Sequence, residues 1–203
     1  MSFYSILGRV GLSIAIAGTC TLVAAGQTAG QAGQSTMGNM SEKNPSGLDS
    51  ADKTFVRKAA QGGMAEVELG KLAAERAASP QVKKFGERMV ADHTKANQEL
   101  KEMAGRKNIP LPESVDAKDE ATKQKLASLS GEEFDRAYMS DMVKDHTQDV
   151  SEFKHETTSA KDPEVKQFAT KTLPTLEQHL KVAKQIEPEV AKGKQQKSEN
   201  EMK

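Results

Sequence analysis

The sequence is poor in cysteine and in aromatic residues. Its 203 residues include one cysteine, no tryptophan, two tyrosines and six phenylalanines. A single cysteine excludes an intrachain disulfide framework and any zinc or iron–sulfur site built from several thiolates. A net charge is also lacking, because 29 lysine and arginine residues balance 29 aspartate and glutamate residues. Without a basic excess there is no broad surface for phosphate backbones, which argues against nucleic-acid binding.

The short motifs of several enzyme classes are also missing. The sequence has no haem-attachment motif, phosphate-binding loop, nucleophile elbow or serine triad. It therefore predicts an architecture and a candidate site, and it leaves open whether the protein is an enzyme.

Residues 1–25 have the composition of a signal peptide. They contain no acidic residue and one basic residue, Arg9, which an apolar run over 10–25 follows. A run of about 16 residues suits a signal-peptide core and is short for a membrane span. Because Val23-Ala24-Ala25 supplies small residues for cleavage, we expect a mature chain that begins near Gly26. That chain would be periplasmic or secreted and would have no transmembrane span.

Cys20 offers a second interpretation of the same segment. Small residues at 17–19 precede it, as in lipoproteins that are acylated on a cysteine, but the usual leucine three places before the cysteine is absent. On this interpretation the protein is a lipoprotein of the cell envelope. An uncleaved N-terminal anchor is disfavoured because the apolar run is short.

Two polar segments flank a helical region. Residues 26–49 are rich in Gly, Gln, Ser and Asn and predict a flexible linker, and residues 188–203 predict a disordered tail. Over 50–187, apolar residues recur with the 3.6-residue period of a helix and without strand-like alternation. We therefore expect one all-α domain.

Four long helices are predicted within this domain, beginning near Ser50, Ser79, Ser130 and Asp162. Ser79 and Asp162 each precede a proline, which suits the first position of a helix. The helices form two tight hairpins joined by a long connection over roughly 104–130, in which 118–127 predicts a short exposed helix. Four helices of about 25 residues predict a four-helix bundle. The connection is long enough to cross the bundle, so the direction of the third helix relative to the second stays open.

Two internal echoes suggest a pseudo-twofold arrangement. SPQVKKF, which begins at Ser79, resembles DPEVKQF, which begins at Asp162. MVADHT, which begins at Met89, matches MVKDHT, which begins at Met142, at five of six positions. The two echoes are offset by different lengths of chain, so the pattern is not one clean duplication.

Polar residues on the apolar seams of these helices mark a candidate site. Glu66, His93 and His146 occupy seam positions where an apolar residue would stabilise the fold better. Counted from the hairpin turns, they lie near mid-height, with Glu177 or His179 beside them. Carboxylate and imidazole ligands suit Fe, Mn or Zn, so these five residues predict a divalent-metal site.

The alternative is that the histidines only pack in the core. None of His93, His146 and His179 has a glutamate three residues before it, which is the spacing of di-iron bundles. Asp92 and Asp145 fit the helical rows as well as the histidines that follow them. Pro174 bends its helix and leaves open whether Glu177 or His179 points inward. Methionines on the seams are interpreted as gap-filling core residues rather than copper ligands. Glycines in the first helix, which are Gly62, Gly63 and Gly70, are interpreted as close packing rather than as room for a ligand.

The sequence resembles the exported bacterial family known as domain of unknown function 4142. The resemblance lies in four segments, EVELGKLA, VKKFGERMVADHTKAN, MVKDHT and LPTLEQHLKVA. The resemblance covers about 50–187 and implies a ferritin-like helical bundle. It carries the family's residue pattern onto Glu66, Asp92, His93, Asp145, His146 and His179. It implies no established activity, so two functions stay open. One is a divalent-metal protein of envelope metal or redox stress protection, and the other is a non-enzymatic interaction or stress protein without metal.

Overall fold

The computed structural model describes residues 47–201, with side chains described up to residue 192. It contains five helices, α1 (Ser50–Arg76), α2 (Pro80–Arg106), α3 (Ala117–Ala127), α4 (Gly131–Ser159) and α5 (Pro163–Glu201). No strand occurs among residues 47–201, where the one bridge pairs Ala77 with Gly131. The all-α prediction is confirmed.

The predictions for the N-terminus lie outside the described residues. These are the signal peptide over 1–25, the lipid attachment at Cys20 and the linker up to residue 46. None of the helices within residues 47–201 is long and apolar enough to cross a membrane.

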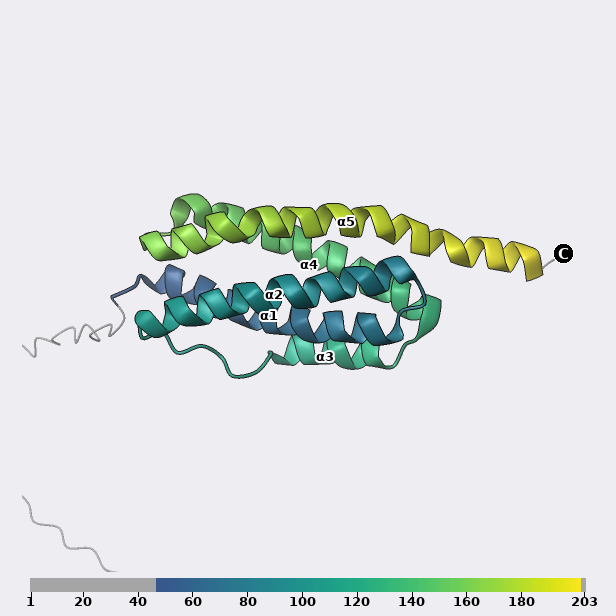
Figure 1. Cartoon of the computed structure of the whole chain (residues 1–203), viewed down its shortest axis with the longest axis horizontal. Helices are drawn as coiled ribbons and strands as arrows, with labels where there is room; N and C mark the ends of the chain where they lie inside the picture. The colour runs from purple at the N-terminus through teal and green to yellow at the C-terminus, as the bar shows by residue number, and fades with distance from the viewer. Residues whose placement is uncertain (1–46, 202–203) are drawn as a thin grey trace, which may run out of the picture. The chain divides into compact units, whose positions relative to one another are not determined.

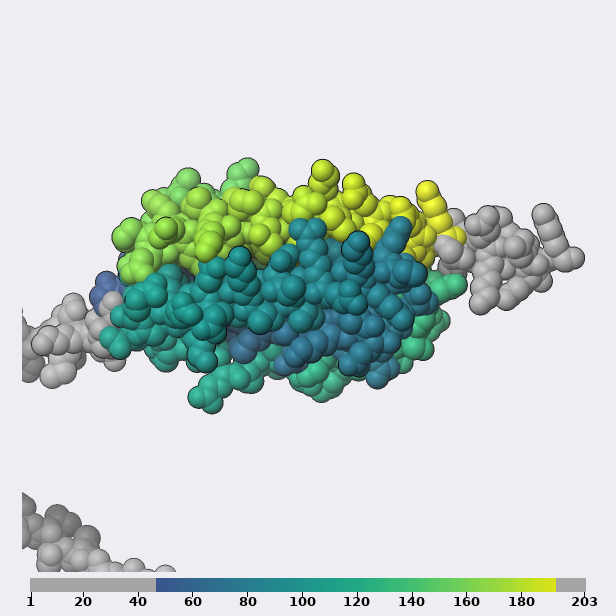
Figure 2. Space-filling view, in the orientation of Figure 1, coloured from purple at the N-terminus to yellow at the C-terminus, as the bar shows by residue number. Residues whose placement is uncertain are grey.

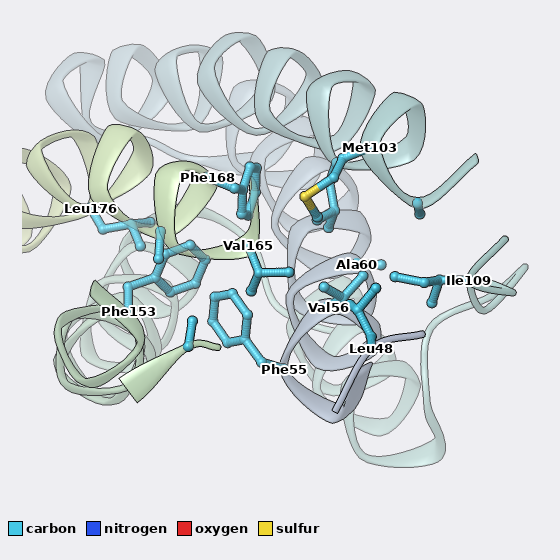
Figure 3. Close-up of a cluster of buried hydrophobic side chains, with 14 residues drawn as sticks. Leu48, Phe55, Val56, Ala60, Met103, Ile109, Phe153, Val165, Phe168 and Leu176 are labelled. Atoms are coloured by element: carbon cyan, nitrogen blue, oxygen red, sulfur yellow. The ribbon is translucent and has the colours of Figure 1, made fainter. Parts of the chain in front are cut away.

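Two hydrophobic clusters fill the interior. The Phe55 cluster joins the first halves of α1 and α5 to the second halves of α2 and α4, as Figure 3 shows for its largest members. The Phe85 cluster joins the opposite halves of the same helices. Its buried members are Leu69, Ala73, Ala77, Val82, Phe85, Met89, Leu126, Phe134, Tyr138, Met139, Met142, Ala183 and Ile186.

The order in which each helix passes through the clusters gives its direction. α1 and α5 run from the Phe55 cluster toward the Phe85 cluster, and α2 and α4 run the other way. The long helices that contact one another are α1 with α2, α4 with α5, α2 with α5 and α1 with α4. Each of these pairs is antiparallel, and Figure 2 shows α2 and α5 packed side by side along one face. The third predicted helix therefore runs in the same direction as the second.

The connection between α2 and α4 crosses the length of the domain and carries α3. α3 lies beside α1 in Figure 1 and contacts both α1 and α4. Its Leu126 is buried in the Phe85 cluster, and Lys123 forms an ion pair with Glu68 of α1 at 2.6 Å. The helix predicted at 118–127 is thus present, but it is packed against the domain rather than exposed, and the described helices number five.

An aspartate from the other hairpin holds each hairpin turn. Asp135 of α4 accepts hydrogen bonds from the backbone N–H groups of residues 78 and 79, at 3.1 and 2.8 Å. Asp52 of α1 does the same for residues 161 and 162, at 3.2 and 2.8 Å. The interval along the chain from Asp52 to Asp135 equals the interval between the two turns. The longer sequence echo therefore corresponds to equivalent positions in space. Asp135 holds the turn that precedes α2, and the Ser79 side chain makes no cap bond.

α1 and α2 approach closely at two glycines. A Cβ atom added to Gly70 would lie 2.7 Å from the carbonyl oxygen of Gly86, and one added to Gly86 would lie 2.6 Å from the Cβ of Ala73. The interpretation of Gly70 as a close-packing residue is confirmed. A Cβ added to Gly62 would meet nothing within 4 Å, so the close-packing interpretation is wrong for Gly62.

α5 continues past residue 187, where the sequence places the start of a tail. The helix includes Pro174 and Pro188 and ends at Glu201 (Figure 1). Residues 189–201 are rich in Glu, Lys and Gln, which favour helices, and Val190 packs against the Phe85 cluster.

Candidate metal centre

One buried polar residue in each long helix separates the two hydrophobic clusters. The residues are Glu66 in α1, His93 in α2, His146 in α4 and His179 in α5, with exposed fractions of 1, 7, 0 and 0%. Along its helix, each lies between the residues of the Phe55 cluster and those of the Phe85 cluster. Counting residues from the hairpin turns predicts this common height, because two residues that are equally far from a turn along regular helices lie at the same height in the hairpin.

The three imidazole rings form one compact group. Ring centroids are 5.9 Å apart for His93 and His146, and 5.4 Å apart for each of the pairs with His179. One nitrogen from each ring lies within 4.8 Å of the other two. Nitrogens bound at about 2 Å from a common ion lie roughly 3.4 Å apart. Side-chain shifts of about 1 Å would therefore allow one ion to bind all three rings.

Hydrogen bonds fix the tautomers of two of the histidines. Nδ1 of His146 lies 3.1 Å from the carbonyl oxygen of Met142, and Nε2 of His179 lies 2.8 Å from a carboxylate oxygen of Asp92. Since both oxygens are acceptors, these two nitrogens carry the protons. Nε2 of His146 and Nδ1 of His179 therefore present lone pairs. Neither makes a hydrogen bond within the described part of the chain, and the same is true of Nε2 of His93.

The surroundings keep the three rings neutral. Burial lowers the pKa of His93 well below its usual value, and the neighbouring histidines lower it further. Burial lowers the pKa of His146 to about 4. The pKa of His179 is also lowered by burial, although Asp92 acts in the opposite direction. At neutral pH all three imidazoles therefore retain the lone pair that a metal ion needs.

Glu66 lies beside the histidines but belongs to a second group. Its Oε1 is 3.9 Å from Nδ1 of His146, and one of its carboxyl oxygens lies within 4.8 Å of oxygens from Asp145 and Asp149. Burial raises the pKa of Glu66 well above its usual value, and the Asp145 carboxylate raises it further. Burial likewise raises the pKa of Asp149 to about 8. Burial thus disfavours the charged form of Glu66.

The structure places Glu177 outside this group. Its side chain is exposed, while Leu176, His179 and Ala183 lie on the buried face of α5. Each residue advances about 100° around a helix, so the side chain of residue 177 leaves the helix about 100° away from that of Leu176 and roughly 160° away from that of His179. Of the two residues that the sequence leaves open, His179 is the one that points inward.

The structure also shows which member of each Asp-His pair faces the interior. His93 and His146 face the interior, whereas Asp92 and Asp145 are half-buried beside them. Sequence reasoning missed Asp149, whose carboxyl joins the Glu66 group. Its pattern was visible, because aspartates recur every fourth residue at 141, 145 and 149 and so share one helix face.

A family model described as "Domain of unknown function (DUF4142)" matches residues 37–186. No curated protein matches the sequence of the chain significantly.

Solved structures with the same fold come from a second family of unknown function and from a copper-bound protein. A DUF305 fragment from Deinococcus radiodurans is 18% identical, covers 70% of this chain and 98% of its own, and superposes with a TM-score of 0.62. A DUF305 protein from Streptomyces coelicolor is 15% identical, with coverages of 70% and 94% and a TM-score of 0.60. CopM in its Cu(II)-bound form is 17% identical, with coverages of 68% and 96% and a TM-score of 0.58. Cu(I)- and Ag-bound forms of CopM match as well. At these identities the likeness shows the fold alone.

Proposed function

The chain belongs to the family of domain of unknown function 4142, and on that premise we propose that it binds one transition-metal ion, copper in preference, through His93, His146 and His179. The observation that carries the proposal is a compact group of three buried imidazoles, each with one buried nitrogen that has no hydrogen-bond partner in the described part of the chain. We propose further that the fold is a ferritin-like four-helix bundle of α1, α2, α4 and α5, with α3 as part of the crossover.

The cost of this arrangement without a ligand supports a binding role. A buried polar atom without a partner costs about 1–3 kcal/mol, and three such atoms meet where two apolar clusters would otherwise join. Apolar residues would fill this layer at lower cost, whereas a metal ion would satisfy all three nitrogens at once.

The groups around the rings resemble those around metal-bound histidines. Ligating histidines commonly donate their other ring nitrogen to a carboxylate or a backbone carbonyl. Asp92 accepts such a bond from His179, and the carbonyl oxygen of Met142 accepts one from His146. These bonds leave one nitrogen of each of these two rings free to bind a metal ion.

The donor set favours copper over the hard cations. Three neutral imidazoles suit Cu, Zn, Fe and Ni, while Mn prefers carboxylates. The expectation of Fe, Mn or Zn depended partly on Glu66 and Glu177, but Glu177 is exposed and Glu66 groups with Asp145 and Asp149 rather than with the three histidines. A buried set of three neutral ligands disfavours an ion of high charge, because the cost of burying an ion rises with its charge. The copper- and silver-bound forms of CopM, which share the fold, support the same choice.

We place this activity in the bacterial envelope. The apolar N-terminal segment with Val23-Ala24-Ala25 supports export. There the protein would hold or buffer a metal ion and so protect the envelope from it, with no reaction required of the site. Intact-mass measurement of the exported protein tests this location, since cleavage near Gly26 and acylation at Cys20 give different masses.

Thermal unfolding with a panel of metal ions tests the metal proposal. A ligand that binds only the native state at 100 times its dissociation constant adds about 2.7 kcal/mol to the free energy of unfolding. We expect a raised melting temperature with one equivalent of Cu(I), Cu(II) or Ag(I), smaller effects with Zn(II), and loss of the effect in the double variant His93→Leu, His146→Leu. Replacement of the exposed His155 with leucine is the matched control and should leave the shift intact. If no ion in the panel shifts the wild type, the histidines are core residues and the function without metal is correct.

A further inference from the structure

A second group of potential ligands lies next to the imidazoles and consists only of carboxyl groups. We call Glu66, Asp145 and Asp149 the carboxyl triad, because one oxygen from each lies within 4.8 Å of the other two. Glu66 comes from α1 and the aspartates come from α4. The interval along the chain from Glu66 to Asp149 equals the one that relates the two hairpin turns, so these two residues occupy equivalent positions of the two hairpins.

The buried member of the triad has no hydrogen-bond donor. Glu66 is 1% exposed, and no donor within the described part of the chain reaches either of its carboxyl oxygens. A buried carboxylate without donors is costly, and a neutral carboxyl group at this position needs an acceptor, for which Asp145 is the neighbouring candidate. One of its oxygens lies close to Asp145 and Asp149, so a ligand placed among the three groups would satisfy it.

The aspartates of the triad line a cavity of about 260 Å³. The volume is sufficient for an ion with several water molecules. Four further carboxyl groups, three lysines and one of the imidazoles also line it, namely Asp116, Asp119, Asp141, Glu152, Lys58, Lys118, Lys144 and His93. Among the described residues, no ion pair involves Asp145 or Asp149. The lysines of the cavity therefore leave the triad available for another cation.

The spacing of the aspartates on α4 points to the same conclusion. Asp141, Asp145 and Asp149 follow one another at intervals of four residues. When charged, carboxyl groups at this spacing face each other on a helix and repel one another. A bound cation would convert this repulsion into attraction.

We propose that the carboxyl triad binds a hard divalent cation, such as Mn²⁺ or Ca²⁺, at a site separate from the three imidazoles. Oxygen ligands select hard cations, whereas imidazoles select copper and zinc. The two sites share no ligand, so a substitution that abolishes metal binding at one site can leave binding at the other intact. The protein would thus hold ions of two chemical classes side by side in one layer.

Binding of Mn²⁺ to the purified protein tests the site, because free and bound Mn²⁺ differ in their electron paramagnetic resonance signal. The wild type should bind one equivalent. Glu66→Gln, Asp145→Asn and Asp149→Asn, made singly, should each weaken binding about tenfold or more, since even groups that only support metal ligands contribute that much. The matched control is Asp141→Asn, which removes a carboxylate from the same helix face and the same cavity but not from the triad. It should weaken binding less than about threefold, and excess Ca²⁺ should displace Mn²⁺.

The variant His93→Leu, His146→Leu separates this site from the imidazoles. It should still bind Mn²⁺, and the three carboxyl variants should keep the melting shift with copper. Circular dichroism must show native helix content for every variant, and the three single replacements keep the test valid if one of them does not fold. The inference is overturned if the wild type binds no Mn²⁺, if Asp141→Asn weakens binding as much as Asp145→Asn, or if Mn²⁺ binding is lost with the imidazoles.

Discussion

Replacing His93 with leucine should make the metal-free protein more stable. His93 is 7% exposed, and its Nε2 makes no hydrogen bond within the described part of the chain. Leucine removes that atom and the cost of its burial, which is about 1–3 kcal/mol. It also places an apolar side chain between Met89 and Leu100, one from each hydrophobic cluster.

The loss of contacts between rings opposes this gain. His93 lies 5.9 and 5.4 Å from the rings of His146 and His179, and pairs of aromatic rings contribute about 0.5–1.5 kcal/mol. The two ring pairs together contribute about 1–3 kcal/mol, and burial of the leucine side chain, which stabilises by about 1.5–3 kcal/mol, offsets them. Removal of the unpaired nitrogen then leaves a net increase of about 1–2 kcal/mol in the free energy of unfolding. At roughly 2–4 °C per kcal/mol for a domain of this size, the melting temperature should rise by about 2–8 °C.

Thermal unfolding followed by far-UV circular dichroism, at neutral pH and with a chelator, measures this difference. His155→Leu, on the exposed surface of α4, should change the free energy of unfolding by less than about 0.5 kcal/mol. A lower melting temperature for the His93 variant would refute the reasoning. It would show that His93 contributes net stability as a packed core residue, and that no ligand is needed to explain it.

Two further predictions concern pH and helix packing. The pKa of His146 is lowered from 6.5 to about 4 in the folded protein, so between these pH values the unfolded chain binds more protons than the folded one. As the pH falls through that range, His146 should reduce the free energy of unfolding by up to roughly 3 kcal/mol. Chemical denaturation of metal-free protein at several pH values should show a weaker acid dependence for His146→Leu, and identical slopes for variant and wild type would contradict the prediction. Gly70→Ala should destabilise the domain by about 1–3 kcal/mol, since its Cβ would meet the backbone of Gly86. Gly62→Ala, where the added Cβ meets nothing, should stabilise the domain by up to about 1 kcal/mol. Equal melting temperatures for the two variants would show that the helices do not approach closely at Gly70.

The sequence alone determined the helical class, the starts of the long helices and the height of the polar layer. These depend on local periodicity and on counting residues along regular helices, which the chain encodes over short distances. Glu66, His93 and His146 could be recognised because each replaces an apolar residue on a seam. His179 could be named only together with Glu177, since Pro174 obscures the periodicity just before them.

Tertiary structure decided the features that depend on how the helices meet. The connection before α4 was long enough for either direction, and only the order of the two hydrophobic clusters along the helices shows that α2 and α4 run the same way. Asp149 joined the site because α4 brings its aspartates against Glu66 of α1, a pairing between positions that are far apart in the chain. Periodicity assigns a residue to the face of its own helix, but the partner of that face is set by packing between helices, which no single segment encodes.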